Sequence, residues 1–376
     1  MEEEKRDNRK RRGFFGRLVV GLLTILAWIG VPAMALSMLS GYINPARFVW
    51  ASFFGLAFWE ILLFNILIFF LLLLLWSKRI WIAVLALAIA VPGMLRSFSN
   101  GKPMEGGKLR VMSYNVQIFN DLYDSKKQPA DVALGVINLV REQHPDVLCI
   151  QEFGYFIPKV GRTDCIKQFG ELVEMPYHYY HTKAYFGGNV IYSKYPLSAV
   201  KDQTRFGGEN DYGAVAEVDA GSKGKFIVIC THLSSFRLTK KEVTVFSEPG
   251  TSKQEVQEYG KSIVSKLKNA YRERSEQVNQ LLQDIPHDGR TIILCGDFND
   301  TPLSYTYHQI SKSGFTDSFV VTGRGIGHTY AGKLPLLRID YIWGNAGVQP
   351  MRFRRLRFKG SDHYPVVLDF NINHGV

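Results

Sequence analysis

Hydrophobic residues are distributed along this chain in two different ways. Up to about residue 98 they form three nearly unbroken runs behind a short charged arm: Leu18–Leu39, Phe48–Trp76 and Ile80–Leu95. From Gly101 onward, apolar stretches of strand length alternate with turns and polar helices, as in a soluble domain. We therefore predict a basic cytoplasmic arm over residues 1–17, a membrane anchor over 18–98, a linker over 99–107 and a folded domain over 108–376.

The three runs differ in their ability to cross a bilayer. Leu18–Leu39 and Phe48–Trp76 are long enough for the roughly 30 Å hydrocarbon core, whereas Ile80–Leu95, at about 16 residues and with Pro92 inside it, is marginal. Glu60 is the one charged residue in the second run. It is either a functional group inside the membrane or a side chain near a helix end that reaches the interface.

The basic residues around these runs predict their orientation, because positively charged flanks stay in the cytoplasm. Arg47 alone marks the first loop, Lys78 and Arg79 mark the second, and seven basic residues precede the first run: Lys5, Arg6, Arg9, Lys10, Arg11, Arg12 and Arg17. Three crossings place the folded domain outside the cytoplasm, on the periplasmic side. If the third run lies in the interface instead, the domain is cytoplasmic.

A cleaved signal peptide is the alternative for the first run. Arg9–Ser37 contains a basic start, an apolar centre and the small residues Ala33 and Ala35, in the order that such a peptide requires. The second run would still span a membrane. Either interpretation therefore predicts an integral membrane protein in contact with a lipid bilayer.

The region after residue 108 is rich in predicted strands. Helices are expected at Ala130–Gln143 and Gln254–Leu282, and strands at LRVMSYNV, DVLCIQE, NVIYSKYP, AVAEVDA, KFIVICTHL, TIILCGDFN, RIDYIWG and VVLDFNI. Many strands with few helices favour two packed sheets flanked by helices.

Polar residues interrupt these apolar strands or follow them directly: Asn115, Glu152, His232, Asp297, Asn299 and Asp340. Burying such groups without partners is costly, so several of them are expected to converge in one place. Asp362 and His363 add another acid and imidazole before the last strand. Each residue alone has a plainer explanation, since GDFND is also a turn sequence and His232 could be a core histidine.

Net charge and cysteine positions exclude few kinds of partner or site. The net charge is +11, and residues 101–376 hold 34 Lys and Arg against 29 Asp and Glu, which permits binding to nucleic acid or anionic lipid without requiring it. Cys149, Cys230 and Cys295 lie in or beside apolar strands, where a thiol acts as a small hydrophobe, and Cys165 lies in a more polar stretch. With no CxxC pair, the sequence suggests neither a zinc knuckle nor a disulfide framework.

Several motifs together resemble a known family. In order they are SYNVQIFN, the pair Gln151 and Glu152, NVIYSKYPL, THL, GDFND, RIDYI and SDHYPV. They are similar to the motifs of the endonuclease/exonuclease/phosphatase superfamily, which includes deoxyribonuclease-like nucleases, abasic-site endonucleases, sphingomyelinases and inositol-polyphosphate phosphatases. The resemblance spans about Leu109 to Asn371 and implies an α+β fold, a four-layer α/β/β/α sandwich of two mainly antiparallel sheets.

The resemblance also implies a metal site. Glu152 is expected to be the principal ligand, with Asn115 and Asp362 completing the site directly or through water. Together with Asp297 and Asp340 these acids would place four carboxylates in one cleft, where each like-charge pair at 4 Å costs on the order of 4 kcal/mol. A divalent cation must therefore intervene, and hard oxygen ligands favour Mg²⁺ or Mn²⁺ over zinc.

By the same resemblance, His363 is the base that activates water, and Asp340 fixes its tautomer. Asp297 and Asn299 would orient the water or a second metal, and His232 would donate to the phosphoryl group. Whether Asp297 or His363 takes the proton stays open.

The chain departs from the family pattern in two segments. Ser234 to about Asn269 is long and rich in Lys and Ser, and the loop Gly323–Leu337 carries three residues that are candidates for shaping substrate choice: His328, Thr329 and Tyr330. The three-run anchor is also not a general feature of the superfamily.

The sequence thus predicts a membrane-anchored, Mg²⁺-dependent enzyme that hydrolyses phosphodiester or phosphomonoester bonds. Its substrate would be a nucleic acid or a phospholipid headgroup, and no protein partner is inferred. The alternative is a non-catalytic module that keeps the fold for binding or scaffolding. Loss of Glu152 or His363 would have favoured this alternative, yet every expected catalytic position is filled.

Overall fold

The computed structural model describes residues 2–120, 127–157, 161–180, 188–200, 213–245, 251–332 and 336–373. The chain forms two compact units. Met1–Arg96 and Leu303–Tyr305 make up the first, and Ser97–Pro302 and Thr306–Val376 make up the second. The first unit is mainly helical, and the second contains both large sheets.

Helices in the first unit follow the three apolar runs. They are α1 (Glu2–Leu39), the short η1 (Ser40–Tyr42), α2 (Pro45–Phe48), α3 (Trp50–Leu56), α4 (Phe58–Leu74) and α5 (Ile80–Ser97). Gly13–Tyr42 and α5 are each long and apolar enough to cross a membrane, with mean hydropathies of 2.2 and 1.9. The second run is not one straight helix, because α3 and α4 meet at a 64° bend.

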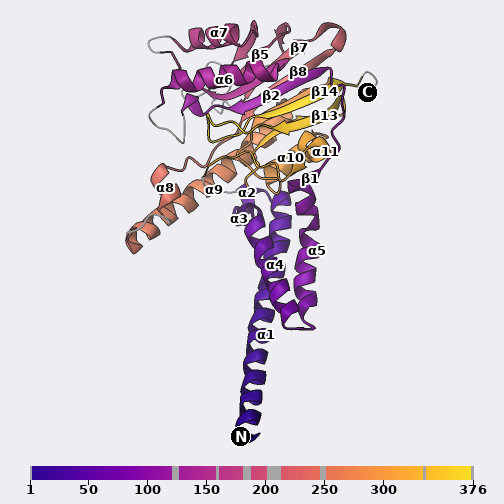
Figure 1. Cartoon of the computed structure of the whole chain (residues 1–376). Helices are drawn as coiled ribbons and strands as arrows, with labels where there is room; N and C mark the ends of the chain where they lie inside the picture. Colours follow the sequence, from indigo (N-terminus) through magenta and orange to yellow (C-terminus); the bar gives the residue numbers. More distant parts are fainter. Residues whose placement is uncertain are drawn as a thin grey trace. The chain divides into compact units, whose positions relative to one another are not determined.

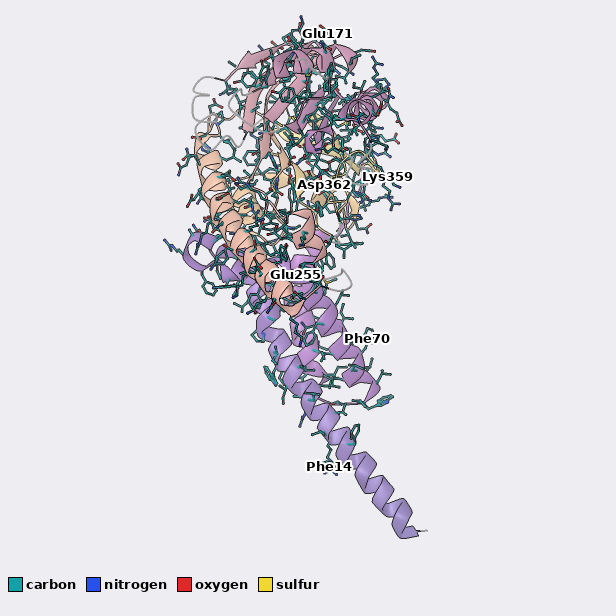
Figure 2. The ribbon with its side chains drawn as sticks, turned by 90° about the vertical axis from the view of Figure 1, so that its left-hand side faces the viewer. Phe14, Phe70, Glu171, Glu255, Lys359 and Asp362 are labelled. Atoms are coloured by element: carbon teal, nitrogen blue, oxygen red, sulfur yellow. The ribbon has the colours of Figure 1, made fainter. Side chains whose placement is uncertain are left out.

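The first unit exposes large apolar side chains and buries small polar ones. Phe14 of α1 is 71% exposed and Phe70 of α4 is 53% exposed, and both project outward from the helices (Figure 2). Asn65 is fully buried, and its Nδ2 donates to the carbonyl oxygen of Ile61 at 2.8 Å. Glu60 is exposed in the first turn of α4, which favours the interpretation that it lies near a helix end. This distribution suits helices that contact lipid.

The second unit contains two six-stranded sheets. The first sheet has the order β10-β12-β9-β8-β7-β6, built from β6 (Leu197–Ala199), β7 (Gly213–Asp219), β8 (Lys225–His232), β9 (Ile292–Asp297), β10 (Thr316–Asp317) and β12 (Asp340–Gly344). The second sheet has the order β13-β14-β2-β3-β5-β4, built from β2 (Leu109–Asn115), β3 (Val147–Phe153), β4 (Tyr177–Tyr180), β5 (Gly188–Ser193), β13 (Val348–Arg355) and β14 (Val366–Ile372). Among the described strands, only β2·β3 and β8·β9 pair in parallel, so both sheets are mainly antiparallel as predicted.

Helices cover the outer faces of the two sheets (Figure 1). On the second sheet lie α6 (Pro129–Gln143) and α7 (Arg162–Leu172), whose apolar side chains share a core with β2, β3 and β5. On the first lie α9 (Lys253–Asp284) and α10 (Tyr305–Lys312), where the rings of Tyr307 and Trp343 are 4.7 Å apart. The expected four-layer α/β/β/α sandwich is confirmed. The short elements α8 (Lys240–Thr244), α11 (Ser318–Thr322), β1 (Ser99–Asn100) and β11 (Arg324–Gly325) add to this frame.

A second apolar core lies between the two sheets. It contains side chains such as Val111 of β2, Val228 of β8 and Leu368 of β14, together with the three strand cysteines Cys149, Cys230 and Cys295. Those thiols are free and buried, as small hydrophobes should be. Cys165 is also buried, on α7, although its surrounding sequence is polar.

All eight predicted strands and both predicted helices of this unit are present, with ends displaced by up to three residues. Elements that the sequence analysis omitted include β4, β6, α7, α10 and β13. The omission of β13 has a clear cause: in the sequence VQPMRFRR, arginines and a proline obscure the apolar alternation. A register shift between Pro350 and Arg352 accommodates the proline within the sheet.

Gly296 has a conformation that no other residue can adopt at low cost. Its φ is +144°, and a Cβ there would collide with the carbonyl oxygen of Thr231 in the neighbouring strand. We expect Gly296→Ala to destabilise the protein by about 3 kcal/mol, because both strain and collision must be relieved. Gly221 has φ +61° in open space, so Gly221→Ala should cost only about 1 kcal/mol. Thermal melts of the two variants test this, and equal melting temperatures would contradict it.

Candidate active site

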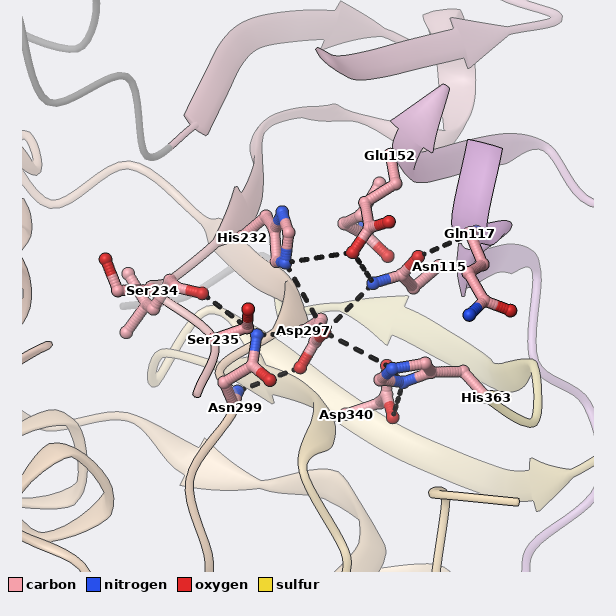
Figure 3. A network of polar contacts seen from close by, with 12 residues as sticks. Asn115, Gln117, Glu152, His232, Ser234, Ser235, Asp297, Asn299, Asp340 and His363 are labelled. Carbon is pink, nitrogen blue, oxygen red and sulfur yellow. Dashed lines mark hydrogen bonds and ion pairs between the residues drawn. The ribbon is translucent and has the colours of Figure 1, made fainter. Parts of the chain in front are cut away.

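The site lies where four strands end. Asn115 ends β2 and is paired with Gln151 of β3, next to Glu152; His232 ends β8 and is paired with Asp297, which ends β9. Because the strands of each parallel pair end at the same edge of their sheet, each sheet brings two polar residues to that edge. Figure 3 shows the side chains from both sheets pointing toward one another.

Asn115 connects the two sheets. Its Nδ2 donates to Oε1 of Glu152 at 3.1 Å and to Oδ2 of Asp297 at 3.0 Å. Its Oδ1 accepts the backbone N–H of Gln117 at 3.0 Å. Both the nitrogen and the oxygen of the side-chain amide therefore make hydrogen bonds, and the nitrogen rather than the oxygen faces the carboxylates. In this arrangement Asn115 holds the two acids at a fixed separation.

His232 faces the same two carboxylates. Its Nε2 is 3.4 Å from Oε1 of Glu152 and 3.6 Å from Oδ2 of Asp297. Within the described residues this buried nitrogen makes no hydrogen bond that meets normal geometry. It is therefore free to donate to an oxygen atom that enters the site.

His363 and Asp340 form a buried pair. Nδ1 of His363 lies 2.9 Å and 3.1 Å from the two carboxylate oxygens of Asp340. The backbone N–H of Asp340 donates to Oγ1 of Thr329 at 3.0 Å, which fixes the start of β12. Nε2 of His363 points into the site, 3.6 Å from Oδ2 of Asp297 and 3.9 Å from Oδ1 of Asp362. The pair thus orients the imidazole toward the other acids.

Burial and charge act in opposite directions on these groups. Burial would lower the pKa of His363, but the attraction of Asp340 and then Asp297 outweighs it and raises that pKa well above 6.5. Burial raises the pKa of Asp297, and burial likewise raises the pKa of Asp362. The cluster therefore favours bound positive charge: a proton on the imidazole or a cation among the carboxylates.

Two site residues, Asn299 in the GDFND loop and Glu152 in β3, have a strained backbone conformation. Oδ1 of Asp297 accepts the backbone N–H of Asn299 at 2.8 Å, and Nδ2 of Asn299 donates to Oδ2 of Asp297 at 3.1 Å and to the carbonyl oxygen of Leu233 at 2.9 Å. Asn299 has φ +52° and Glu152 has φ +54°. Non-glycine residues in this region cost about 1–3 kcal/mol each and concentrate at functional sites. Both residues are held in place by hydrogen bonds or neighbouring strands.

The order and placement of these residues match a known family. Residues 112–363 match the Endonuclease/Exonuclease/phosphatase family over most of the folded domain. The chain belongs to this family. Residues 20–97 match a Domain of unknown function (DUF8431), and no curated protein matches the chain.

Solved structures of the Endonuclease/Exonuclease/phosphatase fold are distant relatives. A family protein from Beutenbergia cavernae is 17% identical, with 70% of this chain and 72% of that chain covered and a TM-score of 0.47. The human Nocturnin catalytic domain is 17% identical, with 72% and 96% covered and a TM-score of 0.49. The 3′ phosphatase NExo from Neisseria, bound to a product DNA hairpin, is 16% identical, with 70% and 99% covered and a TM-score of 0.46.

The donor set fits a divalent cation of the kind used in the Endonuclease/Exonuclease/phosphatase family. In the described part of the chain, only histidines form ion pairs with Glu152, Asp297, Asp340 and Asp362. Ligand atoms of Asp297, Asp340 and His363 lie within 4.8 Å of one another. Carboxylate oxygens with no arginine or lysine beside them are the ligands that Mg²⁺ and Mn²⁺ prefer.

The structure brings all eight sequence-predicted site residues into one network and adds residues that the sequence analysis missed. Oγ of Ser361 donates to the carbonyl oxygen of Asn115 at 2.7 Å and accepts the backbone N–H of His363 at 3.2 Å. With its amide turned, Gln117 donates to Oδ1 of Asp362 at 3.2 Å. Ser361 is the first residue of the SDH motif, so its sequence position did offer a signal. Gln117 lies in the SYNVQIFN motif, two residues after Asn115, so its position offered the same kind of signal.

The buried Arg274, which follows the Ser234–Asn269 segment in the chain, connects two loops of the site. Nη1 of Arg274 on α9 donates to the carbonyl oxygen of Ser234 at 2.8 Å, and its Nε donates to Oδ2 of Asp300 at 3.3 Å. Arg274 therefore ties the loop after His232 to the loop after Asp297. In the preceding segment, Lys266 pairs with buried Glu242 at 2.7 Å; residues 246–250 lie outside the described residues.

Proposed function

We propose that this chain is a membrane-anchored, divalent-metal-dependent hydrolase that cleaves phosphodiester or phosphomonoester bonds. The observation that supports it most is the Asn115 bridge, which places Glu152 of one sheet beside Asp297 of the other, between His232 and His363. Two imidazoles flanking a carboxylate cluster supply both proton transfer and cation binding in one place. A nucleic acid or a phospholipid headgroup carries the phosphate ester that such a site would accept.

Glu152 and Asp362 are the residues we assign to the cation, with Asn115 acting through its carboxylate contacts or through water. The cation, Mg²⁺ or Mn²⁺, would neutralise the carboxylates and polarise the phosphoryl oxygen. Asp297 and Asn299 would orient the attacking water or a second cation.

The proton transfers are assigned to the two histidines. His363, held by Asp340 through Nδ1, would take the proton of the water at Nε2 once a bound cation offsets the carboxylates that otherwise raise its pKa. Asp340 stabilises the imidazolium that forms. Nε2 of His232 lies 3.6 Å from Oδ2 of Asp297 and would donate to a phosphoryl oxygen. Asp297 lies within reach of both imidazoles and is the alternative proton acceptor.

A substrate panel tests the activity. The full chain in detergent, with Mg²⁺, is assayed on bis(p-nitrophenyl) phosphate and then on DNA, RNA, sphingomyelin and inositol phosphates. Turnover that is lost in Glu152→Gln and kept in Asp288→Asn, an exposed acid paired with Arg290, supports the proposal. Absence of turnover on every substrate would favour a non-catalytic binding or scaffolding module.

The membrane anchor is supported by the helices of the first unit. Two helices are long and apolar enough to span, and α3 with α4 forms either a third, broken span or a re-entrant loop. Basic residues before the first run favour a cytoplasmic N-terminus. With three crossings, the hydrolase domain would face the periplasmic side.

A reporter fused after Val376 is therefore expected to behave as extracytoplasmic. Alkaline phosphatase should be active in that fusion, because a cytoplasmic start and three crossings place the C-terminus outside. The same reporter fused after Ser77, between the second and third runs, serves as the matched control and should be inactive. An inactive fusion after Val376 with an active cytoplasmic reporter at the same place would overturn this orientation.

A further inference from the structure

Arg355 lies at the same edge of the sheet as the catalytic residues. Both β13 and β2 pair antiparallel with β14, and Val366 of β14 is paired with Arg355 on one side and with Ser113 on the other. Arg355 and Ser113 are thus two strand spacings apart, roughly 10 Å. Asn115 follows two residues after Ser113. Arg355 therefore ends its strand beside the active site.

The side chain of Arg355 lies on the inner face of its sheet. Phe353 packs in the core between the two sheets, and residues two apart in a strand share a face. Arg352 and Arg354 lie on the opposite face, where Nη1 of Arg354 donates to Oε1 of Gln143 on α6 at 3.1 Å. Of these three arginines, only Arg355 is directed to the side where the acids converge.

Neighbouring groups hold the Arg355 guanidinium in place. Its Nη1 lies 2.9 Å from the carbonyl oxygen of His328 and 2.8 Å from Nε2 of the same residue. The guanidinium lies 4.9 Å from the ring centroid of Tyr364, and the His328 and Tyr364 rings meet edge to face at 5.9 Å. Tyr364 directly follows His363, and its backbone N–H donates to the carbonyl oxygen of Thr329 at 2.7 Å. The cluster of Arg355, His328 and Tyr364 is thus joined to the proposed base, because Tyr364 is the next residue after His363.

Among the described residues, no acid pairs with the positive groups of this cluster. Burial lowers the pKa of Arg355, and Arg357 lowers it further. Burial also lowers the pKa of His328, with additional contributions from Arg355 and Arg357. Within the described residues, Arg355, Arg357 and Lys359 form no ion pair with a carboxylate. Such crowding of like charge is relieved when an anion binds.

The positive residues form a row that leads to the catalytic segment. Arg355, Arg357 and Lys359 occupy every second position, and Arg357 and Lys359 are exposed. Between them, Phe358 packs against the ring of Tyr114 at 6.2 Å and anchors the segment. Figure 2 shows Lys359 and Asp362 in the same region of the domain. Positive charges that alternate along one segment of the chain suit the repeating phosphates of a nucleic acid better than a single headgroup, which side chains from several elements would have to surround.

We propose that Arg355, Arg357 and Lys359 form a phosphate track that binds a single-stranded nucleic acid on one side of the scissile bond. This inference rests on the proposed function for the identity of the adjoining site. The track supplies the charge, and the half-buried rings of His328 and Tyr364 beside it supply the aromatic surface that accompanies arginines in single-strand binding sites. A phosphate track of this kind would make nucleic acid the preferred substrate class.

Binding of a fluorescein-labelled oligothymidylate of ten nucleotides tests the track. The full chain in detergent carries His363→Ala to slow cleavage, and anisotropy is measured with Mg²⁺ at several salt concentrations. Adding Arg355→Ala and Arg357→Ala together should raise Kd at least tenfold, because hydrogen bonds to charged groups contribute more than about 1.4 kcal/mol each. The log–log salt dependence should become shallower by about 0.7 for each phosphate group that the variant no longer neutralises.

Arg352→Ala is the matched control, because it removes an exposed arginine from the outer face of the same strand. It should leave Kd unchanged. Arg355→Lys should recover only part of the affinity, since lysine cannot keep the paired contacts to His328. Equal Kd values for the double variant and the Arg352→Ala control would overturn the track. Inositol trisphosphate that competes in wild type but not in the double variant, with oligothymidylate binding unchanged, would overturn the choice of nucleic acid.

The experiments distinguish failure of the proposed hydrolase activity from failure of the proposed phosphate track. Hydrolysis of bis(p-nitrophenyl) phosphate by the wild-type chain reports the proposed activity without any second phosphate. Hydrolysis combined with unaltered oligothymidylate binding in the double variant would reject only the track. Track-dependent binding by a chain that hydrolyses nothing would reject only the proposed activity.

Discussion

Replacing His363 by alanine is expected to lower kcat by a factor on the order of 10² to 10⁴, the range for loss of a general acid–base group. Nδ1 of this imidazole is held by both oxygens of Asp340, at 2.9 Å and 3.1 Å, and its Nε2 points into the acid cluster. Because His363 and Asp340 form a buried pair, the substitution leaves the Asp340 carboxylate without its partner and should also lower the melting temperature. The measurement is kcat at saturating Mg²⁺, with thermal melts as the control for folding.

Asp340→Asn added to His363→Ala should cost little more than His363→Ala alone. Residues that act as one unit are strongly non-additive, because the second substitution removes a contribution that has already gone. The two single variants and the double variant complete the cycle. If the two reductions in kcat multiply, Asp340 acts on the cation or elsewhere, and Asp297 becomes the better assignment for the base.

Removal of divalent cations is expected to abolish activity, and Mg²⁺ or Mn²⁺ should restore it. Glu152, Asp297, Asp340 and Asp362 lie together without any lysine or arginine among their described ion pairs. At an effective dielectric of 20, each like-charge pair at 4 Å costs about 4 kcal/mol. A phosphate ester would add to this repulsion. We therefore expect substrate to bind beside these acids only when a cation is bound.

The measurement is hydrolysis in excess EDTA, followed by titration with Mg²⁺, Mn²⁺ and Zn²⁺. Glu152→Gln should raise the Mg²⁺ concentration needed for half-maximal activity, whereas Asp288→Asn should not. Unchanged hydrolysis in EDTA would contradict the metal assignment. Restoration by Zn²⁺ alone would contradict the choice of a hard cation.

Features that depend on neighbouring residues along the chain could be predicted well. The apolar runs predicted the helices of the first unit, and alternation predicted eight strands of the second. The prediction was poorer where local pattern and tertiary environment differ. In β13, arginines fill both the outer face and the end of the inner face, so its alternation does not look amphipathic. The bend between α3 and α4 was missed because the apolar run continues across it without a Pro or a turn sequence.

For the site, too, the sequence predicted the residues but not the contacts among them. Most of the acids and histidines were predicted from their positions at strand ends, Asp362 and His363 were predicted from the SDH motif, and the order of the motifs indicated the family. Sequence could not show that the nitrogen of Asn115 faces two carboxylates from different sheets, 37 and 182 residues away. It also could not show that Ser361 holds the backbone at Asn115, or that Arg355 ends its strand beside the acids. Such contacts depend on register and on packing between sheets.

The sequence by itself therefore predicted the two-sheet sandwich, the family and the apolar helices that are long enough to span a membrane, and it proposed the eight site residues, because hydrophobic periodicity and short motifs are local properties of the chain. The tertiary structure alone decided how those residues are joined and what lies beside them: the Asn115 bridge, the Arg274 support and the position of Arg355 at the sheet edge where the acids converge. The physical reason is that a side chain's partners are set by strand pairing and sheet packing, which bring together residues that are far apart in the chain.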